Sequence, residues 1–421
     1  MRFLPALLLC AFLALATGKT AHGQPASSDK TEGGFSFSRI FDPRTSPFIP
    51  IPEIGTDPNS GTTFGLLPVF LSTNPEGHIS RIIAPDIIYT PGLRYGGHFR
   101  MFSYPSDDRQ WHVVVGAKQR IERELDVTYA AGLTRQSPLS LSGSVIYDRS
   151  ATERFFGFGN HSPLGDETNY TNEQEYVDAV FGWNLDPHLQ IGYDLRPRVI
   201  QIERGTFGHL PSIEARFPQL SGLGDEHELL NRLFIAYDTR DSAAIPTRGG
   251  EIVGFVGHAD RDLLSSVTYS FFGLDARRFI PLGERFILAG HAALRYMPGD
   301  TAPFWAQSSL GGDRSVIGDR QLLRGFGSDR FIDRNSFSAS IELRSHVFDL
   351  DLFSTRVTLE LAPFIDTGRV FHNLNDNPVS HLHTVEGLGV RALASPFIVG
   401  YVDIGYGSEG TAVFSGIDYA F

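Results

Sequence analysis

The chain has 421 residues, a formal net charge of −12 at pH 7 and a single cysteine, Cys10. Because Cys10 lies in a segment expected to be removed, a disulfide framework and a cysteine metal cluster are excluded. The acidic balance argues against nucleic-acid binding, and 44 glycines, 33 phenylalanines and recurrent turn signals indicate many strands in one sheet.

Residues 1–23 have the pattern of a secretory signal peptide. Arg2 supplies the positive start, residues 4–16 form an apolar run, and Ala21-His22-Gly23 offers small residues for cleavage. An uncleaved anchor helix is the weaker alternative, because crossing a bilayer takes about 20 residues. A lipoprotein site at Cys10 is also weaker, because this cysteine sits inside the apolar run with no small residue before it.

Residues 24–60 are polar and then rich in proline, with Pro43, Pro47, Pro50, Pro52 and Pro58. We interpret them as a disordered or extended periplasmic leader that is too short for a further domain of ordinary size. Residues 61–421 then show one strand pattern after another and no long stretch of helical period. The sequence therefore predicts an all-β chain.

Alternation of apolar and polar residues defines these strands, most clearly in residues 285–297, 336–347 and 355–370. A soluble sandwich would alternate in the same way, but the signal peptide and the aromatic residues near strand ends favour a barrel in lipid. In the last stretch we expect Val357, Leu359, Leu361 and Ile365 to meet lipid, and Arg356, Thr358, Glu360, Phe364 and Asp366 to face a wet lumen.

The pattern predicts a transmembrane antiparallel β-barrel of about 16 strands, integral to the bacterial outer membrane. An even strand number places both chain ends in the periplasm. Short connections such as 186–188 and 281–283 are expected to be periplasmic turns. The longer segments near 156–172, 205–228 and 303–335 are expected to be extracellular loops.

The last residues alternate as the final strand of such a barrel would. Val413, Ile417, Tyr419 and Phe421 share one face, and Gly416, Asp418 and Ala420 share the other. An aromatic residue at the end of such a strand is typical of outer-membrane barrels. We interpret Ile417, Tyr419 and Phe421 as an assembly signal for the barrel-assembly machinery during biogenesis.

Three fragments near the C-terminus point to an inward-folded loop. Segment 303–335 contains Leu323-Arg324-Gly325-Phe326, Glu342 lies on the predicted lumen face, and Phe364-Ile365-Asp366-Thr367-Gly368 places Phe364 and Asp366 on the lumen face of the next strand. If the loop folds into the barrel, Arg324 needs carboxylate partners, and Glu342 and Asp366 are within reach. Gly325 would allow a sharp turn at the tip.

This arrangement resembles the BamA/TamA superfamily of outer-membrane proteins, also called the bacterial surface antigen family. Barrels of that family have sixteen strands, an inward loop with a [VIL]-R-G-[FY] tip and an F-x-D-x-G strand motif that receives its arginine. Arg324, Phe364, Asp366 and Gly368 match these motifs, and residues 237–241, 246–249 and 156–160 also resemble family stretches. The resemblance covers residues 140–421 well and 61–139 weakly.

The resemblance implies a role in outer-membrane protein assembly or translocation. Its mechanism would be strand pairing at a weak seam between the first and last strands, with no bond made or broken and no catalytic residue. The short leader departs from the family, because it leaves no room for the periplasmic POTRA domains that better-known members carry. Expected partners are outer-membrane lipid and an unfolded outer-membrane or secreted client protein.

Two other functions stay open at this point, a passive pore or surface-exposed adhesin and, with less support, an outer-membrane hydrolase. No diagnostic catalytic motif occurs, so we expect no enzyme, no cofactor and no metal. His372, His381 and His383 are expected in a solvated loop, and Asp349 and Asp351 beside a turn, rather than at metal sites. Trp111, Trp183 and Trp305 are candidates for the aromatic belt, with packing nearly as good an account, and Arg356 and Glu360 for a lumen ion network.

Overall fold

The computed structural model describes residues 48–57, 60–74, 79–313, 321–352, 355–394, 397–416, 419 and 421. The predicted signal peptide and most of the predicted leader lie outside these residues. No helix in the described part of the chain is long and apolar enough to cross a membrane.

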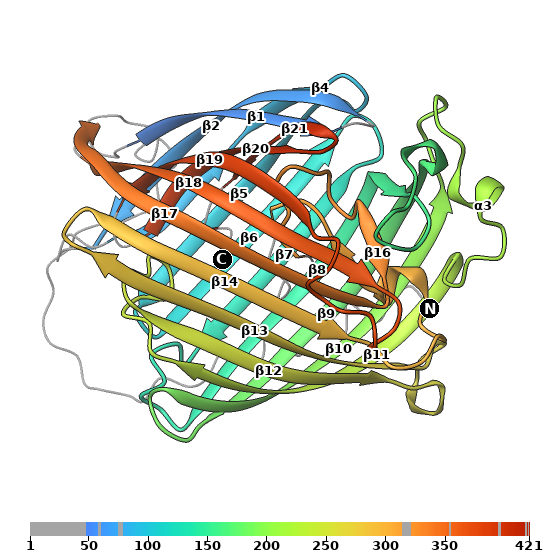
Figure 1. The fold of residues 1–421 in the computed structure, drawn as a ribbon. Helices are drawn as coiled ribbons and strands as arrows, with labels where there is room; N and C mark the ends of the chain where they lie inside the picture. The colour runs from blue at the N-terminus through green and yellow to red at the C-terminus, as the bar shows by residue number, and fades with distance from the viewer. Residues whose placement is uncertain are drawn as a thin grey trace, which may run out of the picture.

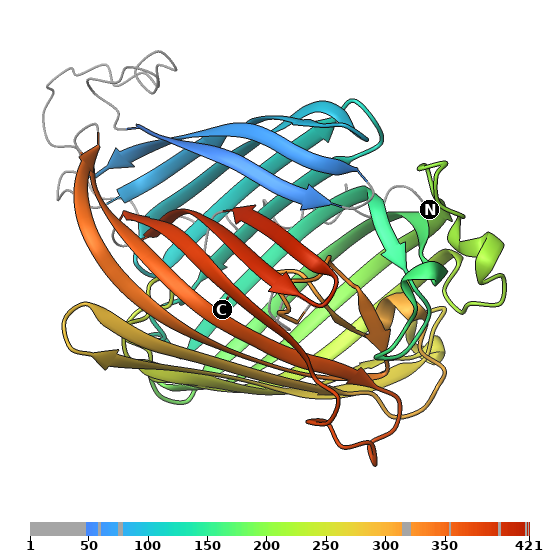
Figure 2. The ribbon, with the colours of Figure 1, turned by 45° about the horizontal axis from the view of Figure 1, so that its top comes forward.

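One large antiparallel sheet curves into a barrel (Figures 1 and 2). Its strands are β1 (Phe48–Asp57), β2 (Gly61–Thr73), β3 (Ile79–Pro85), β4 (Ile87–Thr90), β5 (Arg94–Ser106), β6 (Arg109–Lys118), β7 (Arg123–Ala131), β8 (Leu139–Phe155), β9 (Thr168–Asn184), β10 (Leu189–Arg204), β11 (Gly224–Asp238), β12 (Gly249–Ala259), β13 (Tyr269–Leu282), β14 (Phe286–Tyr296), β17 (Asn335–Leu352), β18 (Thr355–Phe371), β19 (His383–Ala394), β20 (Phe397–Gly407) and β21 (Gly410–Gly416).

The strands follow one another around the barrel as a meander, each antiparallel to the next. The described sheet has 19 strands, and β3 and β4 share one position between β2 and β5 because Asp86 interrupts them. The wall of the barrel therefore has more strand positions than the 16 strands predicted. The difference arises at the N-terminal side, where the turn signals of the sequence are least clear.

Shorter elements lie in the connections. Strands β15 (Ser308–Leu310) and β16 (Phe331–Asp333) form a small second sheet within the connection from β14 to β17. Helix α3 (Ile213–Arg216) lies in the β10–β11 loop, and 3-10 turns occupy Leu164–Asp166, Arg261–Leu263 and Phe304–Ala306. The long connections gather at one end of the barrel, here called the long-loop end (Figure 1).

The alternation predicted from the sequence is present along the wall. In β14 the odd-numbered positions from Ile287 to Arg295 are buried, and the even-numbered positions between them are exposed or half-buried. In β17, Ser338, Ser340, Glu342 and Arg344 are buried, whereas Ile341 is 59% exposed to the surroundings of the barrel. A period of two thus separates a polar interior from an apolar outer surface, as an outer-membrane barrel requires.

Two predicted placements are wrong. Residues 48–57, assigned to the leader, form β1 and pair with β2 along its whole length. The prolines at 50 and 52 are tolerated because β1 lies at the edge of the ladder, where a missing N–H costs little. Val357, predicted to meet lipid, is 2% exposed and packs inside the barrel.

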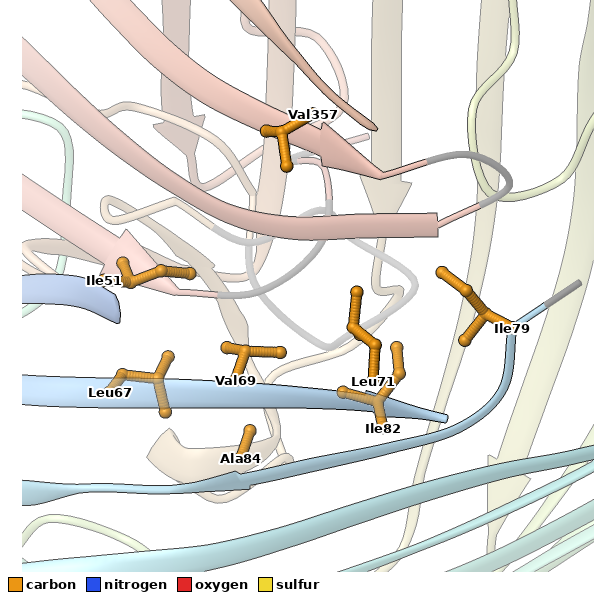
Figure 3. Packing of buried hydrophobic residues seen from close by; sticks show 8 residues of the cluster. All are labelled: Ile51, Leu67, Val69, Leu71, Ile79, Ile82, Ala84 and Val357. Atoms are coloured by element: carbon orange, nitrogen blue, oxygen red, sulfur yellow. The ribbon is translucent and has the colours of Figure 1, made fainter. Parts of the chain in front are cut away.

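Val357 belongs to an apolar cluster that spans the first and last parts of the wall. Figure 3 shows Val357 of β18 facing Leu71 of β2 and Ile79 of β3, with Ile51, Leu67 and Val69 alongside. These side chains come from segments almost three hundred residues apart. Burial of such apolar surface holds the N-terminal strands against the C-terminal ones where strand pairing is incomplete.

The turn from β11 to β12 contains the Asp-Thr-Arg-Asp stretch seen in the sequence. Asp241 accepts hydrogen bonds from the backbone N–H groups of Thr247 and Arg248 and from the Thr247 hydroxyl. Burial alone would raise the pKa of the Asp241 carboxyl, but these hydrogen bonds outweigh it and hold the pKa below its usual range. Asp241 therefore stabilises the turn in its ionised form.

A lowered pKa has a defined consequence for acid stability. The contribution of Asp241 is present above the unfolded pKa of about 3.9 and is lost as the pH falls through the lower folded value. We expect the exchange protection factor of the Thr247 amide, measured by NMR in micelles, to fall in that range. Equal protection in wild type and Asp241→Ala at pH 7 would contradict this role.

Candidate functional site

The connection between β14 and β17 folds into the barrel rather than away from it (Figure 2). Its apolar side chains pack against the inner faces of β18 and β19. The buried cluster contains Leu310, Leu323, Phe326 and Phe331 from the loop, and Phe364, Val370 and Val385 from the wall. The loop is therefore part of the packed interior, which places its tip among lumen-facing polar residues.

Arg324 at the loop tip is fully buried and bound by three carboxylates. Its Nε and Nη2 donate to the two oxygens of Asp366 at 2.8 and 2.7 Å, a bidentate pairing. Its Nη1 donates to Glu342 at 2.6 Å and to Asp403 at 2.8 Å. The backbone N–H of Arg324 also donates to Asp366 at 3.1 Å, so the carboxylate fixes both main chain and side chain.

An aromatic ring and a hydroxyl complete the pocket around the guanidinium. The Arg324 Cζ atom lies 3.5 Å from the centre of the Phe364 ring, a close cation–π contact. Nη2 donates to the Ser340 hydroxyl at 3.2 Å, and that hydroxyl in turn donates to Asp366 at 2.6 Å. Every member of the predicted strand motif thus touches Arg324 or makes room for the loop.

The two glycines of the motifs serve close packing. A Cβ on Gly325 would lie 2.7 Å from a Val385 methyl and 2.8 Å from the Gly407 nitrogen. A Cβ on Gly368 would lie 2.7 Å from the Phe337 carbonyl oxygen and 3.2 Å from Leu310. The expected sharp turn is present, because the Phe326 N–H donates to the Leu323 carbonyl at 3.1 Å across Gly325. Gly325 has no positive φ, so lack of space and not a left-handed backbone disfavours a side chain there.

Asp403, Arg344 and Arg391 belong to the same network and were not predicted. Arg344 Nε donates to Glu342 at 3.1 Å, and Arg391 Nη2 donates to Glu342 at 3.0 Å. Arg391 also lies 3.5 Å from both Glu360 and Asp403. The alternation in residues 400–406 could have placed Asp403 in the lumen, but it does not say which cation Asp403 meets.

Tyr419 and Phe421 lie outside β21, which ends at Gly416. Both side chains pack inside the barrel, so the prediction that they share one face of the last strand with Val413 is wrong. The Phe421 ring stacks on His291 with centroids 5.1 Å apart and packs with Phe279, Ile287, Ala289 and Leu322. Ile417, the third residue of the predicted assembly signal, lies outside the described residues.

The internal C-terminal residues are joined to the arginine network. Arg344 stacks over the Tyr419 ring at 3.8 Å and donates to the Phe421 backbone oxygen at 3.3 Å. The Tyr419 hydroxyl donates to Glu360 at 3.2 Å. A continuous set of contacts therefore runs from the loop tip through Glu342 and Arg344 to the end of the chain.

The Phe-Gly-Phe-Gly-Asn stretch supports the loop from the long-loop end. Asn160 accepts from the backbone N–H of Val370 at 3.1 Å and donates to the His381 carbonyl at 2.9 Å. The Gly159 N–H donates to the carbonyl of Ile332, a residue of β16, at 2.8 Å. Gly157 and Gly159 have φ of +87° and +105°, which side chains rarely adopt.

The remaining candidates fall at ordinary structural positions. His383 stacks on Phe331 at 4.0 Å, His372 contacts Asp333 at 3.0 Å, and no described group of three or more His, Cys, Asp or Glu residues could hold a metal. Arg356 pairs with Asp349 near a turn and not with the lumen network, because its side chain is 73% exposed. The side chain of Asp351 lies outside the described ones.

Trp305 lies in the inward loop under Arg198, so its expected place in an aromatic belt is wrong. Trp183 is 51% exposed on the outer surface.

Removing the buried guanidinium should destabilise the barrel strongly. Arg324→Ala leaves three carboxylates without their shared cation, and breaking such a buried set typically costs about 3–5 kcal/mol. We expect the band of the folded barrel on gels to disappear at a lower sample-heating temperature than in the wild type. Arg356→Ala, which removes an exposed pair worth about 0–1 kcal/mol, is the matched control. Equal behaviour of the two variants would contradict a lock at Arg324.

Truncating the last residue tests the internal tail. Phe421→Ala removes a 6% exposed ring from the pocket on β13 and β14, and comparable core truncations cost about 3–5 kcal/mol. We expect a lower urea midpoint for folded barrel in micelles. Leu264→Ala, at a side chain that is 81% exposed, should leave the midpoint unchanged. If Phe421→Ala also leaves it unchanged, the ring is not anchored in that pocket.

Comparison with known proteins agrees with this architecture. Residues 111–398 match the Omp85 superfamily domain. BamA from Haemophilus ducreyi lacking POTRA domains 1–3 is structurally similar, with a TM-score of 0.51, 13% identity, and coverage of 90% of this chain and 77% of that one. CdiB from Acinetobacter baumannii has a TM-score of 0.48 and 12% identity, covering 89% of this chain and 66% of that one. Comparison with curated proteins gives no match.

The family match covers more than half of the chain and contains the loop tip, Glu342 and the strand motif. The all-β fold, the alternating wall and the buried loop are consistent with it. This chain belongs to the Omp85 superfamily and forms an outer-membrane β-barrel.

Proposed function

We propose that this barrel assembles or translocates client polypeptides by opening the seam between β1 and β21, without making or breaking a covalent bond. The observation that supports this function is the lack of a described backbone ladder at the seam. Every other neighbouring pair around the wall forms a backbone ladder, whereas β1 and β21 form none among the described residues. The weakest part of the wall therefore lies between the two ends of the sheet.

Among the described residues, side chains and not a ladder hold the seam together. At one point the Thr56 hydroxyl accepts from the Val413 N–H at 3.1 Å. Toward the end of the barrel opposite the long-loop end, Ile51 of β1 packs closely on Gly400 of β20. A Cβ on Gly400 would lie 2.6 Å from the Ile51 Cδ1 methyl group. The apolar cluster of Figure 3 continues this contact toward Val357.

An unpaired strand edge is a template for another strand. Backbone N–H and C=O groups at the edge of a sheet accept an added strand with little sequence preference. A client strand entering here would gain backbone hydrogen bonds that the described residues of β1 and β21 do not make with each other.

The arginine network places the loop beside this seam. Asp403, one of the three carboxylates on Arg324, belongs to β20, and Gly405 of the same strand packs against the Arg324 carbonyl. The loop is thereby tied to the strand that precedes β21. In this proposal, Arg324 keeps β20 in position while β21 and β1 separate.

A passive pore is the alternative that the geometry supports less. The inward loop and the C-terminal residues both occupy the barrel interior, where they would obstruct a wide aqueous path. We expect small, irregular conductance in planar bilayers. A large and steady conductance would favour the pore over seam opening.

A disulfide across the seam tests the proposal directly. Thr56→Cys with Val413→Cys should cross-link the two edges, in a mature chain that the sequence predicts to lack other cysteines. Cells relying on the cross-linked variant should show the same losses in a mass-spectrometric census of outer-membrane proteins as cells depleted of the protein, and a reductant should restore the census.

The control is a cross-link that leaves the seam free. Val402 and Ser415 are direct partners within the β20–β21 ladder, so Val402→Cys with Ser415→Cys adds a disulfide without joining the edges. This variant should behave as wild type. If the seam cross-link has no effect while depletion does, seam opening is not the mechanism.

A further inference from the structure

A chamber of about 490 Å³ lies in the barrel interior, away from the arginine network. Its wall consists of the inner faces of β7, β8, β9 and β10, and the inward loop covers it through Phe304, Trp305 and Gln307. Cavities of about 300–1,000 Å³ are the size that small-molecule ligands occupy in proteins. The seam proposed above makes no use of this chamber.

One side of the chamber is lined by carboxylates. Glu124 and Asp126 project from β7, and Asp148 lies directly opposite Glu124 on β8. The Glu124 side chain is 41% exposed, with His98 at 3.6 Å, and the Asp126 side chain is 25% exposed, with His112 at 3.1 Å. These acids remain accessible from the chamber, so this side attracts a cationic group.

The other side is lined by guanidinium groups. Arg196 and Arg198 project from β10, and Arg295 projects from β14. Arg198 pairs with Glu228 at 3.1 Å and stacks over Trp305 at 4.7 Å, and Arg196 lies 3.9 Å from the same Glu228. Arg295 donates to the backbone carbonyls of Gln307 and Ala306 at 3.3 and 3.1 Å. This side therefore attracts an anionic group.

Neutral hydrogen-bonding side chains separate the two charged sides. Asn172, Gln174 and Tyr176 of β9 line the chamber between them. The register aligns Asp126, Ile146, Tyr176 and Arg198 in one row across β7 to β10. Three steps between strands span about 14 Å along the wall, since neighbouring strands lie ~4.8 Å apart.

We propose that this chamber binds a short zwitterionic peptide of about four residues, with its ammonium group toward Glu124, Asp126 and Asp148 and its carboxylate toward Arg196 and Arg198. An extended chain spans about 3.5 Å per residue, so the separation of the two charged sides matches that length. The amides of Asn172 and Gln174 face the peptide backbone. A neutral or apolar ligand would gain no charge-assisted interaction with either side of the chamber.

Binding of tetraalanine to the purified full-length barrel in micelles tests this site by isothermal titration calorimetry. The peptide with free termini should bind saturably. N-acetylation and C-amidation should each weaken binding by about tenfold, because each removes one charge-assisted interaction. Maltotetraose, a neutral ligand of similar extent, should not bind.

A matched pair of variants assigns the ammonium end. Glu124→Gln should weaken binding of the free peptide by about tenfold and leave the N-acetylated peptide unaffected. Glu203→Gln removes a similarly exposed acid that contacts Arg149 outside the chamber, and it should change neither. Folding of each variant is checked by heat-modified gel mobility.

Three results would overturn the proposal. The first is absence of saturable tetraalanine binding to the folded wild-type barrel. The second is equal binding of the doubly blocked peptide, which would show that the charges are not recognised. The third is an equal effect of Glu203→Gln and Glu124→Gln, which would mean that net charge and not the chamber controls binding. None of these results bears on the seam cross-link.

Discussion

The burial of Arg324 is the interaction on which the interior of this barrel depends. Moving a guanidinium out of water costs several kcal/mol, and attraction to carboxylates compensates only when the geometry is close and the remaining donors are satisfied. Here Asp366, Glu342 and Asp403 bind the guanidinium from three different strands, and Phe364 covers its face. These contacts fix the position of the loop tip inside the barrel.

The same network organises the end of the chain. Glu342 binds Arg324 and also Arg344 and Arg391, and these arginines reach Tyr419, Glu360 and the backbone of Phe421. The loop tip and the C-terminal residues therefore share charged partners. Moving either one would remove contacts from carboxylates or guanidinium groups that also hold the other in place. This coupling connects the lumen to the strands beside the seam.

Different interactions close the barrel and cover the chamber. Apolar packing of Ile51, Leu71, Ile79 and Val357 brings the first and last strands together, between which the described residues form no backbone ladder. The chamber is covered because the inward loop crosses the lumen and places Trp305 over Arg198. The loop thus both excludes water from Arg324 and bounds a polar space in another part of the lumen.

The sequence by itself determined the all-β class, the inward and outward faces of most strands, and the pairing of Arg324 with Glu342 and Asp366. Alternation is a local property with a period of two, and the loop and strand motifs carry their chemistry in short stretches. It did not determine that residues 48–57 join the sheet, that Val357 points inward, or that Asp403 is a third partner of Arg324. Tyr419 and Phe421 show the reason most clearly. Their spacing suits a lipid-facing strand, but only the closed barrel supplies Arg344, His291 and Phe279 as internal partners, and those contacts form between segments that the sequence keeps far apart.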